Sequence, residues 1–271
     1  MRRIRILGVG MGPQHVTPEV ADALLSVDYV VAAQKSSDDA LLDVRREICA
    51  AHGVELVPVD DPERDRNDPR DYPRAVADWH EARVTAYEQV LASRPGDVAF
   101  LVWGDPSLYD STIRVVQSLA ERVDLEYDVL PGISAPQLLA ARHRIVLHEV
   151  GRPLHVTTGR LLREAVDTGL DNIAVMLNAR LELDGLEDWQ VWWGANLGTT
   201  DEALVSGRVG DVVADIEKAR SAAKSSAGWV MDVYLLRKPA RAARCSSPAP
   251  RPTPARASSP RACVARSPVV G

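Results

Sequence analysis

The stretch DVAFLVWGDPSLYD, residues 97–110, decides the fold. Its first part is a continuous apolar run, which is typical of a central parallel strand buried on both faces. The run stops abruptly at Gly104-Asp105-Pro106, so the Asp105 carboxylate is expected at the carboxyl edge of a sheet, where open α/β folds bind ligands. Taken alone, Asp105 would equally serve to cap the following helix. The stretch therefore predicts an α/β fold with a candidate ligand site after this strand.

Strands and helices alternate on both sides of this stretch. RIRILGV at residues 3–9 is a short β-type run, and the helix after it is expected to begin with Thr17 as N-cap and Pro18 in its first turn. Further strands are predicted at 28–33, 54–59 and 125–130, and further helices at 39–53, 72–93 and 111–122. This alternation over residues 1–142 predicts an N-terminal α/β domain with a mostly parallel, doubly wound sheet.

The pattern changes after residue 142. Helical stretches become rare apart from about 210–223, and five strand-like segments follow: PLHVTT, NIAVMLN, QVWWGANLG, EALVSG and GWVMDVYLLR. A C-terminal α/β domain with a mixed sheet, spanning residues 143–237, fits this order best.

Residues 238–271 differ from the rest in composition. They are rich in Pro, Ala and Ser, contain no acid and show no hydrophobic periodicity, so they are expected to be disordered. Two interpretations stay open: a basic arm for an anionic partner, or an adventitious extension such as a reading-frame change would produce.

The overall composition excludes several classes of protein. No apolar stretch reaches the roughly 18 residues that a membrane span needs, and the start MRRIRILGVGMGP lacks a signal-peptide pattern, so a cytoplasmic protein without membrane contact is expected. Residues 1–236 hold 24 basic and 38 acidic residues, a formal charge of −14, which is a poor platform for nucleic acid. The three cysteines offer neither a disulfide framework nor a CxxC metal site.

Two further loops close predicted strands. Gly8-x-Gly10-x-Gly12 is similar to a dinucleotide loop, but Pro13 stands where the last glycine would be, and no acid closes the second strand. A nicotinamide-dependent oxidoreductase is therefore disfavoured. In LPGISAP, residues 130–136, the turn brings Ser134 to the start of the next helix, where it would serve as N-cap.

The three loops together carry a family resemblance. GVGMG with the following Thr17-Pro18, then GDPSLY, then PGISA, each closing a strand, resemble the tetrapyrrole (corrin and sirohaem) methyltransferases that use S-adenosylmethionine, over about residues 1–236. The charged insert at 60–83 is similar to the branch that methylates C1 of precorrin-5 and releases acetate, giving precorrin-6A. Methylation at another ring carbon, and a tetrapyrrole-binding protein without turnover, are the alternatives.

The resemblance implies a homodimer of two-domain α/β chains, with the cofactor folded in the cleft between the domains and S-adenosylhomocysteine as product. It implies no metal. The family pattern falls on these cofactor-binding candidates: Met11, Trp103, Gly104, Asp105, Leu108, Ser134, Ala135, Met176, Leu197 and Gly198. Apart from the family pattern, a Met in a strand such as Met176 is usually core filler.

The implied substrate is a macrocycle with many carboxylates, which arginines bind well. Arg64, Arg66 and Arg70 in the insert are the substrate-binding candidates, with Arg74 and Arg83 close behind, although a solvated loop balanced by neighbouring acids is the simpler interpretation. Deacetylation needs water at an acyl carbon. Asp105 and Tyr109 are the catalytic candidates, and His80 is a weaker one because a lone helical histidine is usually a surface or packing residue.

Overall fold

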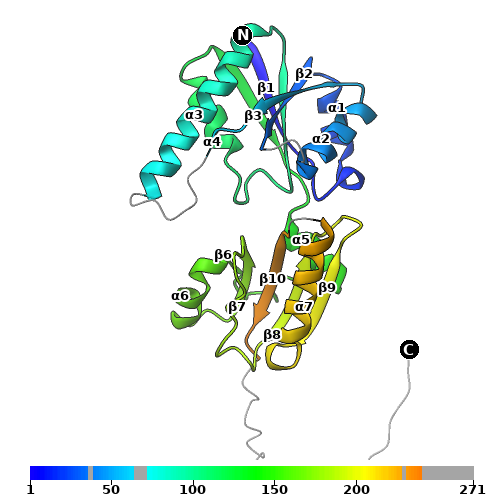
Figure 1. Ribbon diagram of the computed structural model, residues 1–271, viewed down its shortest axis with the longest axis vertical. Helices are drawn as coiled ribbons and strands as arrows, with labels where there is room; N and C mark the ends of the chain where they lie inside the picture. The colour runs from blue at the N-terminus through cyan, green and yellow to red at the C-terminus, as the bar shows by residue number, and fades with distance from the viewer. Residues whose placement is uncertain (36–38, 64–71, 228–229, 240–271) are drawn as a thin grey trace, which may run out of the picture. The chain divides into compact units, whose positions relative to one another are not determined.

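The computed structural model describes residues 1–35, 39–63, 72–227 and 230–239. Two five-stranded sheets organise this part of the chain (Figure 1). None of the described helices is long and apolar enough to cross a membrane. Most of the tail predicted to be disordered, from residue 240 onward, lies outside the described residues.

All five strands of the first sheet run parallel, in the order β3-β2-β4-β1-β5. They are β1 (Arg2–Gly8), β2 (Tyr29–Gln34), β3 (Glu55–Asp60), β4 (Val98–Val102) and β5 (Leu125–Leu130). Every residue of β4 is buried, as its apolar run predicts. The connection from β1 leads toward one edge of the sheet and that from β4 toward the other, so the neighbouring carboxyl ends of β1 and β4 form a switch point. Open α/β folds bind ligands at such points.

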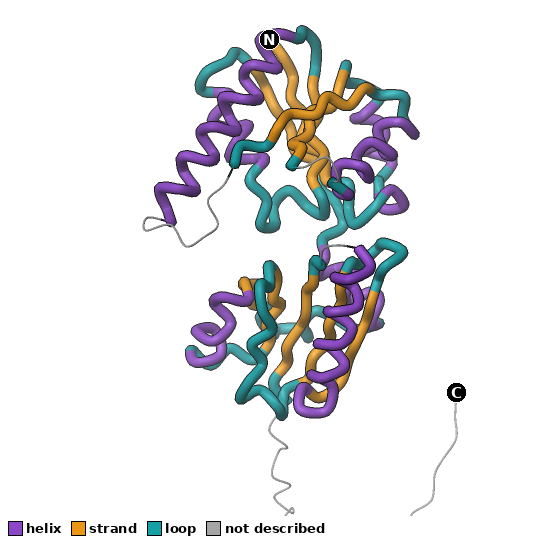
Figure 2. The backbone as a smooth tube through the Cα atoms, in the orientation of Figure 1, coloured by secondary structure: helices purple, strands orange, loops and turns teal. Residues whose placement is uncertain are grey.

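Helices cover both faces of this sheet (Figure 2). They are α1 (Pro18–Leu24), α2 (Ala40–Ala51), α3 (Tyr72–Ser93) and α4 (Thr112–Ala120). The core on the side of α1 and α2 includes Leu7, Leu24, Val30, Ile48 and Leu101. The core on the side of α3 and α4 includes Ile6, Val84, Tyr87, Phe100 and Val116. The doubly wound sheet predicted from the alternation is confirmed.

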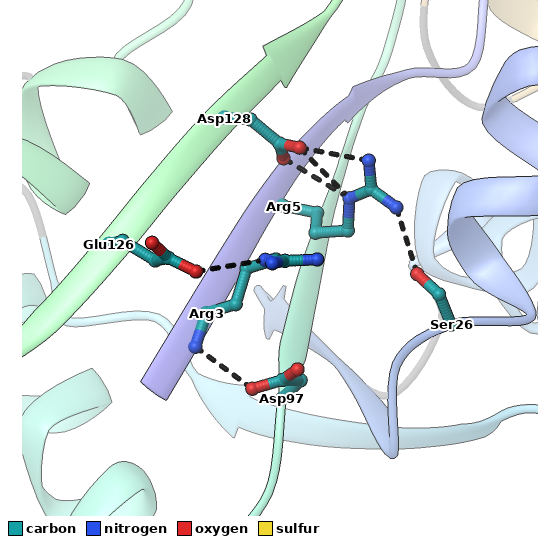
Figure 3. Close-up of polar contacts among 6 residues, drawn as sticks. All are labelled: Arg3, Arg5, Ser26, Asp97, Glu126 and Asp128. Carbon is teal, nitrogen blue, oxygen red and sulfur yellow. Dashed lines mark hydrogen bonds and ion pairs between the residues drawn. The ribbon is translucent and has the colours of Figure 1, made fainter. Parts of the chain in front are cut away.

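Ion pairs join β1 to the edge strand β5 (Figure 3). Arg3 faces Glu126 and Arg5 faces Asp128, with nitrogen–oxygen distances of 3.2 and 2.8 Å. These side chains are partly exposed, so each pair contributes little free energy. The two ion pairs favour the observed register of β1 against β5, because a slip of one residue would separate both arginines from their acids.

The second sheet is mixed, in the order β6-β7-β10-β8-β9. β6 and β7 pair parallel, and every other pair is antiparallel. Its strands are β6 (His155–Thr158), β7 (Asn172–Met176), β8 (Gln190–Ala195), β9 (Ala203–Arg208) and β10 (Asp232–Arg237). One face packs on α5 (Ala135–His143), and the other packs on α6 (Leu162–Asp167) and α7 (Val209–Ala227). A mixed second sheet is what the sequence predicts.

Local signals in the sequence set most element boundaries. The helix predicted at 72–93 is α3 with the same bounds. Thr17 is the N-cap of α1, where its hydroxyl accepts a hydrogen bond from the Val20 amide at 3.2 Å. The prediction did not include α6 or the 3₁₀ turns η1 (Pro13–His15) and η2 (Gly159–Leu161), which are too short to show a periodicity. The helix α5 ends at His143, next to the predicted domain boundary at residue 142, but it packs on the second sheet. The division of the chain into two domains at residue 142 therefore stays a prediction.

Candidate functional site

The loops that follow β1 and β4 are joined backbone to backbone at the switch point. The Gly10 amide donates a hydrogen bond to the Gly104 carbonyl at 3.2 Å, and the Gly104 amide donates to the Gly10 carbonyl at 2.8 Å. Gly104 has φ +75°, a conformation that glycine adopts without strain. The GVGMG and GDP segments therefore form one continuous backbone surface.

The loop after β5 packs on the same surface, and two glycines make the approach possible. A Cβ on Gly132 would lie 2.7 Å from the Gly8 carbonyl carbon and closer still to the Gly104 carbonyl oxygen. A Cβ on Gly8 would lie 2.9 Å from the Pro106 Cδ. All of these are closer than side chains pack, so Gly8 and Gly132 are required by close contact between the three loops.

Asp105 ties the second loop to the third. Its Oδ2 accepts a hydrogen bond from the Gly132 amide at 3.0 Å, and its Oδ1 accepts from the Ser107 amide at 2.8 Å and from the Ser107 hydroxyl. Burial raises the pKa of the Asp105 carboxyl, but the bonds from Ser107 and Gly132 outweigh this and hold the pKa below its usual value. Asp105 is therefore an ionised loop anchor at neutral pH.

Ser134 holds the start of α5. It is the N-cap residue, and the Gln137 side chain accepts hydrogen bonds from the Ser134 amide at 2.9 Å and from its hydroxyl at 2.8 Å. The predicted N-cap is confirmed.

These loops line a cavity of about 380 Å³, which we call the apolar cavity. Its size lies within the usual range for small-molecule sites. The predicted cofactor residues that line it are Met11, Trp103, Gly104, Asp105, Leu108, Ser134, Ala135, Met176 and Leu197. Gly198 does not line the cavity but packs against the backbone of Met11, which does. The φ of Gly198 is +81°, and a Cβ there would collide with the Met11 backbone. The loops from both sheets thus converge on one cavity.

Two residues that line this cavity each contain a buried polar atom with no hydrogen-bond partner among the described residues: Trp103 Nε1 and Asn178 Oδ1. One is a donor and the other an acceptor. Buried polar atoms without partners are rare in native proteins and need an explanation. A ligand that offers both an acceptor and a donor would supply the missing partners.

Sequence reasoning missed part of the lining. Leu177, Asn178 and Ala179 follow β7, and residues 230–233 lead into β10. Of these residues, Asp232 is the one that the sequence could have indicated, because an acid within an otherwise apolar strand-like run is unusual. Its carboxylate is buried and paired with Arg220 at 2.9 Å. The Asn178 side-chain amide donates a hydrogen bond to the Asp232 carbonyl at 3.1 Å. This hydrogen bond fixes the orientation of the Asn178 side chain and therefore the position of its acceptor atom, Oδ1.

A second cavity, also of about 380 Å³, lies at the carboxyl ends of β2 and β4 and is lined by residues of both α2 and α3; we call it the polar cavity. Arg45, Asp61 and Arg83 are among its lining residues. Tyr109 and Leu177 line both cavities. Both have a left-handed backbone, with φ +51° and +56°, and both are exposed large side chains. The two residues therefore mark the junction between the cavities.

The catalytic candidates differ in their position. Tyr109 lies at the junction and donates a hydrogen bond from its hydroxyl to the Val156 carbonyl at 3.3 Å, while burial raises its pKa. His80 lies on α3 against Trp79, with ring centroids 5.0 Å apart, and lines neither cavity. Tyr109 is therefore a protonated hydrogen-bond donor at neutral pH.

The predicted arginines also separate. Arg64, Arg66 and Arg70 lie outside the described residues. Arg74 is exposed on α3, near Asp78. Arg83 is largely buried, lines the polar cavity and pairs with Asp61 at 2.6 Å. The described part of the chain contains no group of three or more His, Cys, Asp or Glu residues that is arranged to hold a metal ion.

Comparison with known proteins gives a consistent set of relatives. A sequence model of the tetrapyrrole (corrin/porphyrin) methylases matches residues 3–213. The chain is 42% identical over 255 residues to a Sinorhizobium sp protein named precorrin-6A synthase (deacetylating), covering 88% of this chain and 96% of that protein.

Solved structures share the fold. A Corynebacterium diphtheriae structure described as a cobalamin synthesis related protein (CobF) has a TM-score of 0.75 and 35% identity, covering 88% of this chain and 99% of that one. A Thermus thermophilus uroporphyrin-III C-methyltransferase complexed with S-adenosylhomocysteine has a TM-score of 0.53 and 16% identity, covering 87% and 97%. At that identity the second likeness supports the fold alone.

Proposed function

The chain belongs to the tetrapyrrole (corrin/porphyrin) methylases, and from this premise we propose that it is an S-adenosylmethionine-dependent C-methyltransferase of cobalamin biosynthesis. The reaction is methylation of precorrin-5 at C1 with release of acetate, which gives precorrin-6A. The identity of 42% to a precorrin-6A synthase (deacetylating), over nearly all of that protein, supports this branch of the family.

The observation that carries the proposal is the apolar cavity at the switch point. It has the size of a small-molecule site, and its two unpartnered polar atoms are a donor on Trp103 and an acceptor on Asn178. These residues fit S-adenosylmethionine, which supplies a methyl group on a sulfonium to a carbon nucleophile. The residues of the three loops and of β7 and β10 would hold that cofactor, with S-adenosylhomocysteine as product.

Positioning accounts for most of the rate enhancement in this proposal, because holding two reactants in line replaces a bimolecular encounter. Asp105 contributes indirectly: it fixes the loops that shape the cavity. Its lowered pKa makes it a weak base, so we assign it a positioning role. Tyr109, at the junction of the two cavities, remains the candidate for direct contact with the substrate.

Two parts of the proposal depend on the family alone. One is the homodimer. The other is a substrate role for Arg64, Arg66 and Arg70, which would act together on the acetate and propionate chains. Replacing all three with alanine should raise the KM for precorrin-5, and an unchanged KM would remove them from the proposal.

The test combines calorimetry with mass spectrometry. The purified chain is titrated with S-adenosylhomocysteine and, as a control, with NAD, and is then incubated with S-adenosylmethionine and precorrin-5. We expect the chain to bind S-adenosylhomocysteine but not NAD, and the macrocycle to gain one methyl group and release acetate. A methyl gained without acetate would move the reaction to another ring carbon. Binding of the macrocycle without S-adenosylhomocysteine binding would overturn the proposal in favour of a carrier.

A further inference from the structure

The polar cavity is lined by Arg45, whose guanidinium forms no ion pair with an acid among the described residues. Arg45, on α2, reaches through to the end of β4, where its Nε donates to the Leu101 carbonyl at 2.9 Å, and its Nη1 donates to the Leu41 carbonyl at 3.2 Å. It takes part in none of the ion pairs formed among the described residues. Burial lowers its pKa, which reflects the free energy needed to keep this charge away from water.

The other buried cation of the cavity is already compensated. Arg83 pairs with Asp61 at 2.6 Å, and both side chains are mostly buried, with exposed fractions of 13% and 7%. Its guanidinium also lies over the Trp79 ring at 4.1 Å from the centroid. The charge of Arg83 is thus neutralised by Asp61, whereas Arg45 forms no ion pair with a described residue.

The remaining acids of the cavity are occupied by backbone amides. Asp39 is the N-cap of α2 and accepts from the Leu42 amide at 3.1 Å. Asp110 accepts from the Thr112 amide at 2.6 Å, just before α4. Both attract Arg45 from a distance but form no bond with it. A charge that is held away from water without an ion-pair partner is unfavourable, and an incoming anion would relieve this.

The position of the cavity relates this charge to the reaction. Tyr109 and Leu177 border both cavities, so an extended ligand in the polar cavity would approach the apolar cavity at these two residues. Their exposed apolar surfaces suit the face of a macrocycle, while the polar cavity beyond them is lined by Arg45, which forms no ion pair with a described residue, and by the exposed Lys35. The arrangement suits a flat apolar ring that carries carboxylate arms.

We propose that Arg45 is a positioning residue that binds one carboxylate arm of the macrocyclic substrate in the polar cavity, so that the carbon to be methylated lies at the Tyr109–Leu177 junction. This inference rests on the proposed function, since it assumes a polycarboxylate substrate. Nη2 of Arg45 makes no hydrogen bond to a described residue and provides the donor. A charge-assisted bond of this kind is expected to change substrate affinity by about tenfold or more.

The experiment compares Arg45→Met and Arg45→Lys in the full chain. The matched control is Arg46→Met, because Arg46 is the next residue on α2 but is exposed, and its ion pair among the described residues is with Asp43, away from the cavity lining. Each variant is titrated with S-adenosylhomocysteine, and its kcat and KM are measured with precorrin-5 by mass spectrometry. We expect Arg45→Met to raise KM about tenfold or more while the affinity for S-adenosylhomocysteine stays unchanged, Arg45→Lys to restore part of the loss, and Arg46→Met to behave as wild type.

An unchanged KM in Arg45→Met would overturn the inference. If Arg45→Met no longer binds S-adenosylhomocysteine, the variant has lost its fold and Arg45→Lys decides. A KM raised in Arg45→Lys with normal cofactor affinity supports the role, and wild-type KM excludes it. Failure of the proposed function is recognised separately, because then the wild-type chain itself neither binds S-adenosylhomocysteine nor methylates precorrin-5.

Discussion

Replacing Gly132 with alanine is expected to separate the three loops that shape the apolar cavity. The new Cβ would lie 2.7 Å from the Gly8 carbonyl carbon and nearer still to the Gly104 carbonyl oxygen, whereas ordinary contact begins at 3.4 Å. Both neighbours are backbone atoms that no side-chain rotation can move. The loops would have to part by about 1 Å, at a cost of about 1 to 3 kcal/mol for overpacking.

The same movement stretches the bond between the Gly132 amide and Asp105, a hydrogen bond to a charged group worth about 1.5 to 3 kcal/mol. Together the two effects lower the free energy of unfolding by about 3 to 5 kcal/mol, a large part of the stability of an ordinary protein. Because the displaced loops line the cavity, the affinity for S-adenosylhomocysteine should fall by at least about tenfold.

Urea unfolding and calorimetry measure both quantities. The control is Gly53→Ala: Gly53 has φ +68° but nothing within 4 Å of a new Cβ, so it isolates backbone strain from collision. We expect a loss of about 1 kcal/mol there with unchanged ligand affinity. If Gly132→Ala were as stable as Gly53→Ala and bound S-adenosylhomocysteine like wild type, close packing of the three loops would not be what requires the glycine.

Three further variants or reactions test other parts of the structure. Asp105→Asn should lower the free energy of unfolding by about 2 kcal/mol. The pKa of Asp105 is lowered in the folded state, so the stability that its carboxylate contributes is fully present above about pH 5 and is lost as the pH falls through the folded pKa. The difference in the free energy of unfolding between Asp105→Asn and wild type should follow the same course in urea titrations from pH 3 to 7. Trp103→Phe should change stability by less than about 1 kcal/mol, since Nε1 has no partner, yet weaken S-adenosylhomocysteine about fivefold in calorimetry; equal affinity would leave that nitrogen unexplained. Burial raises the pKa of the Cys49 thiol to about 11, so iodoacetamide at pH 8 should label Cys49 only after unfolding, as peptide mapping can establish.

The strands and helices of this chain are readable from the sequence because each carries its own local signal. The unbroken apolar run of β4 indicates burial on both faces, and the Thr17-Pro18 pair marks where α1 begins. The 22 residues of α3 are long enough for their boundaries to be predicted correctly. Local chemistry and the final fold agree in these elements, so no tertiary contact has to override the pattern.

The site is only partly readable, since its residues meet through contacts that sequence separation hides. The loop glycines mark the switch point, but nothing in PGISA shows that the Gly132 amide bonds to Asp105. Leu177 and Arg45 gave no signal at all: one looks like the end of a strand and the other like an ordinary surface residue of an amphipathic helix. Their importance comes from the cavities that they border, which exist only after both sheets have formed.

The strand order also governs when this protein can fold during synthesis. β1 contains Ile4, Ile6 and Leu7, all fully shielded in the finished structure, yet its only partners in the sheet are β4 and β5. At typical rates of translation the ribosome needs roughly ten seconds to make the chain from β1 to β5. β2 and β3 can pair once residue 60 has been made, while β1 has no neighbour in the sheet until β4 is complete at residue 102. The nascent chain therefore exposes the apolar side chains of β1 before β4 can cover them, and its yield in cells should depend on chaperones that shield β1.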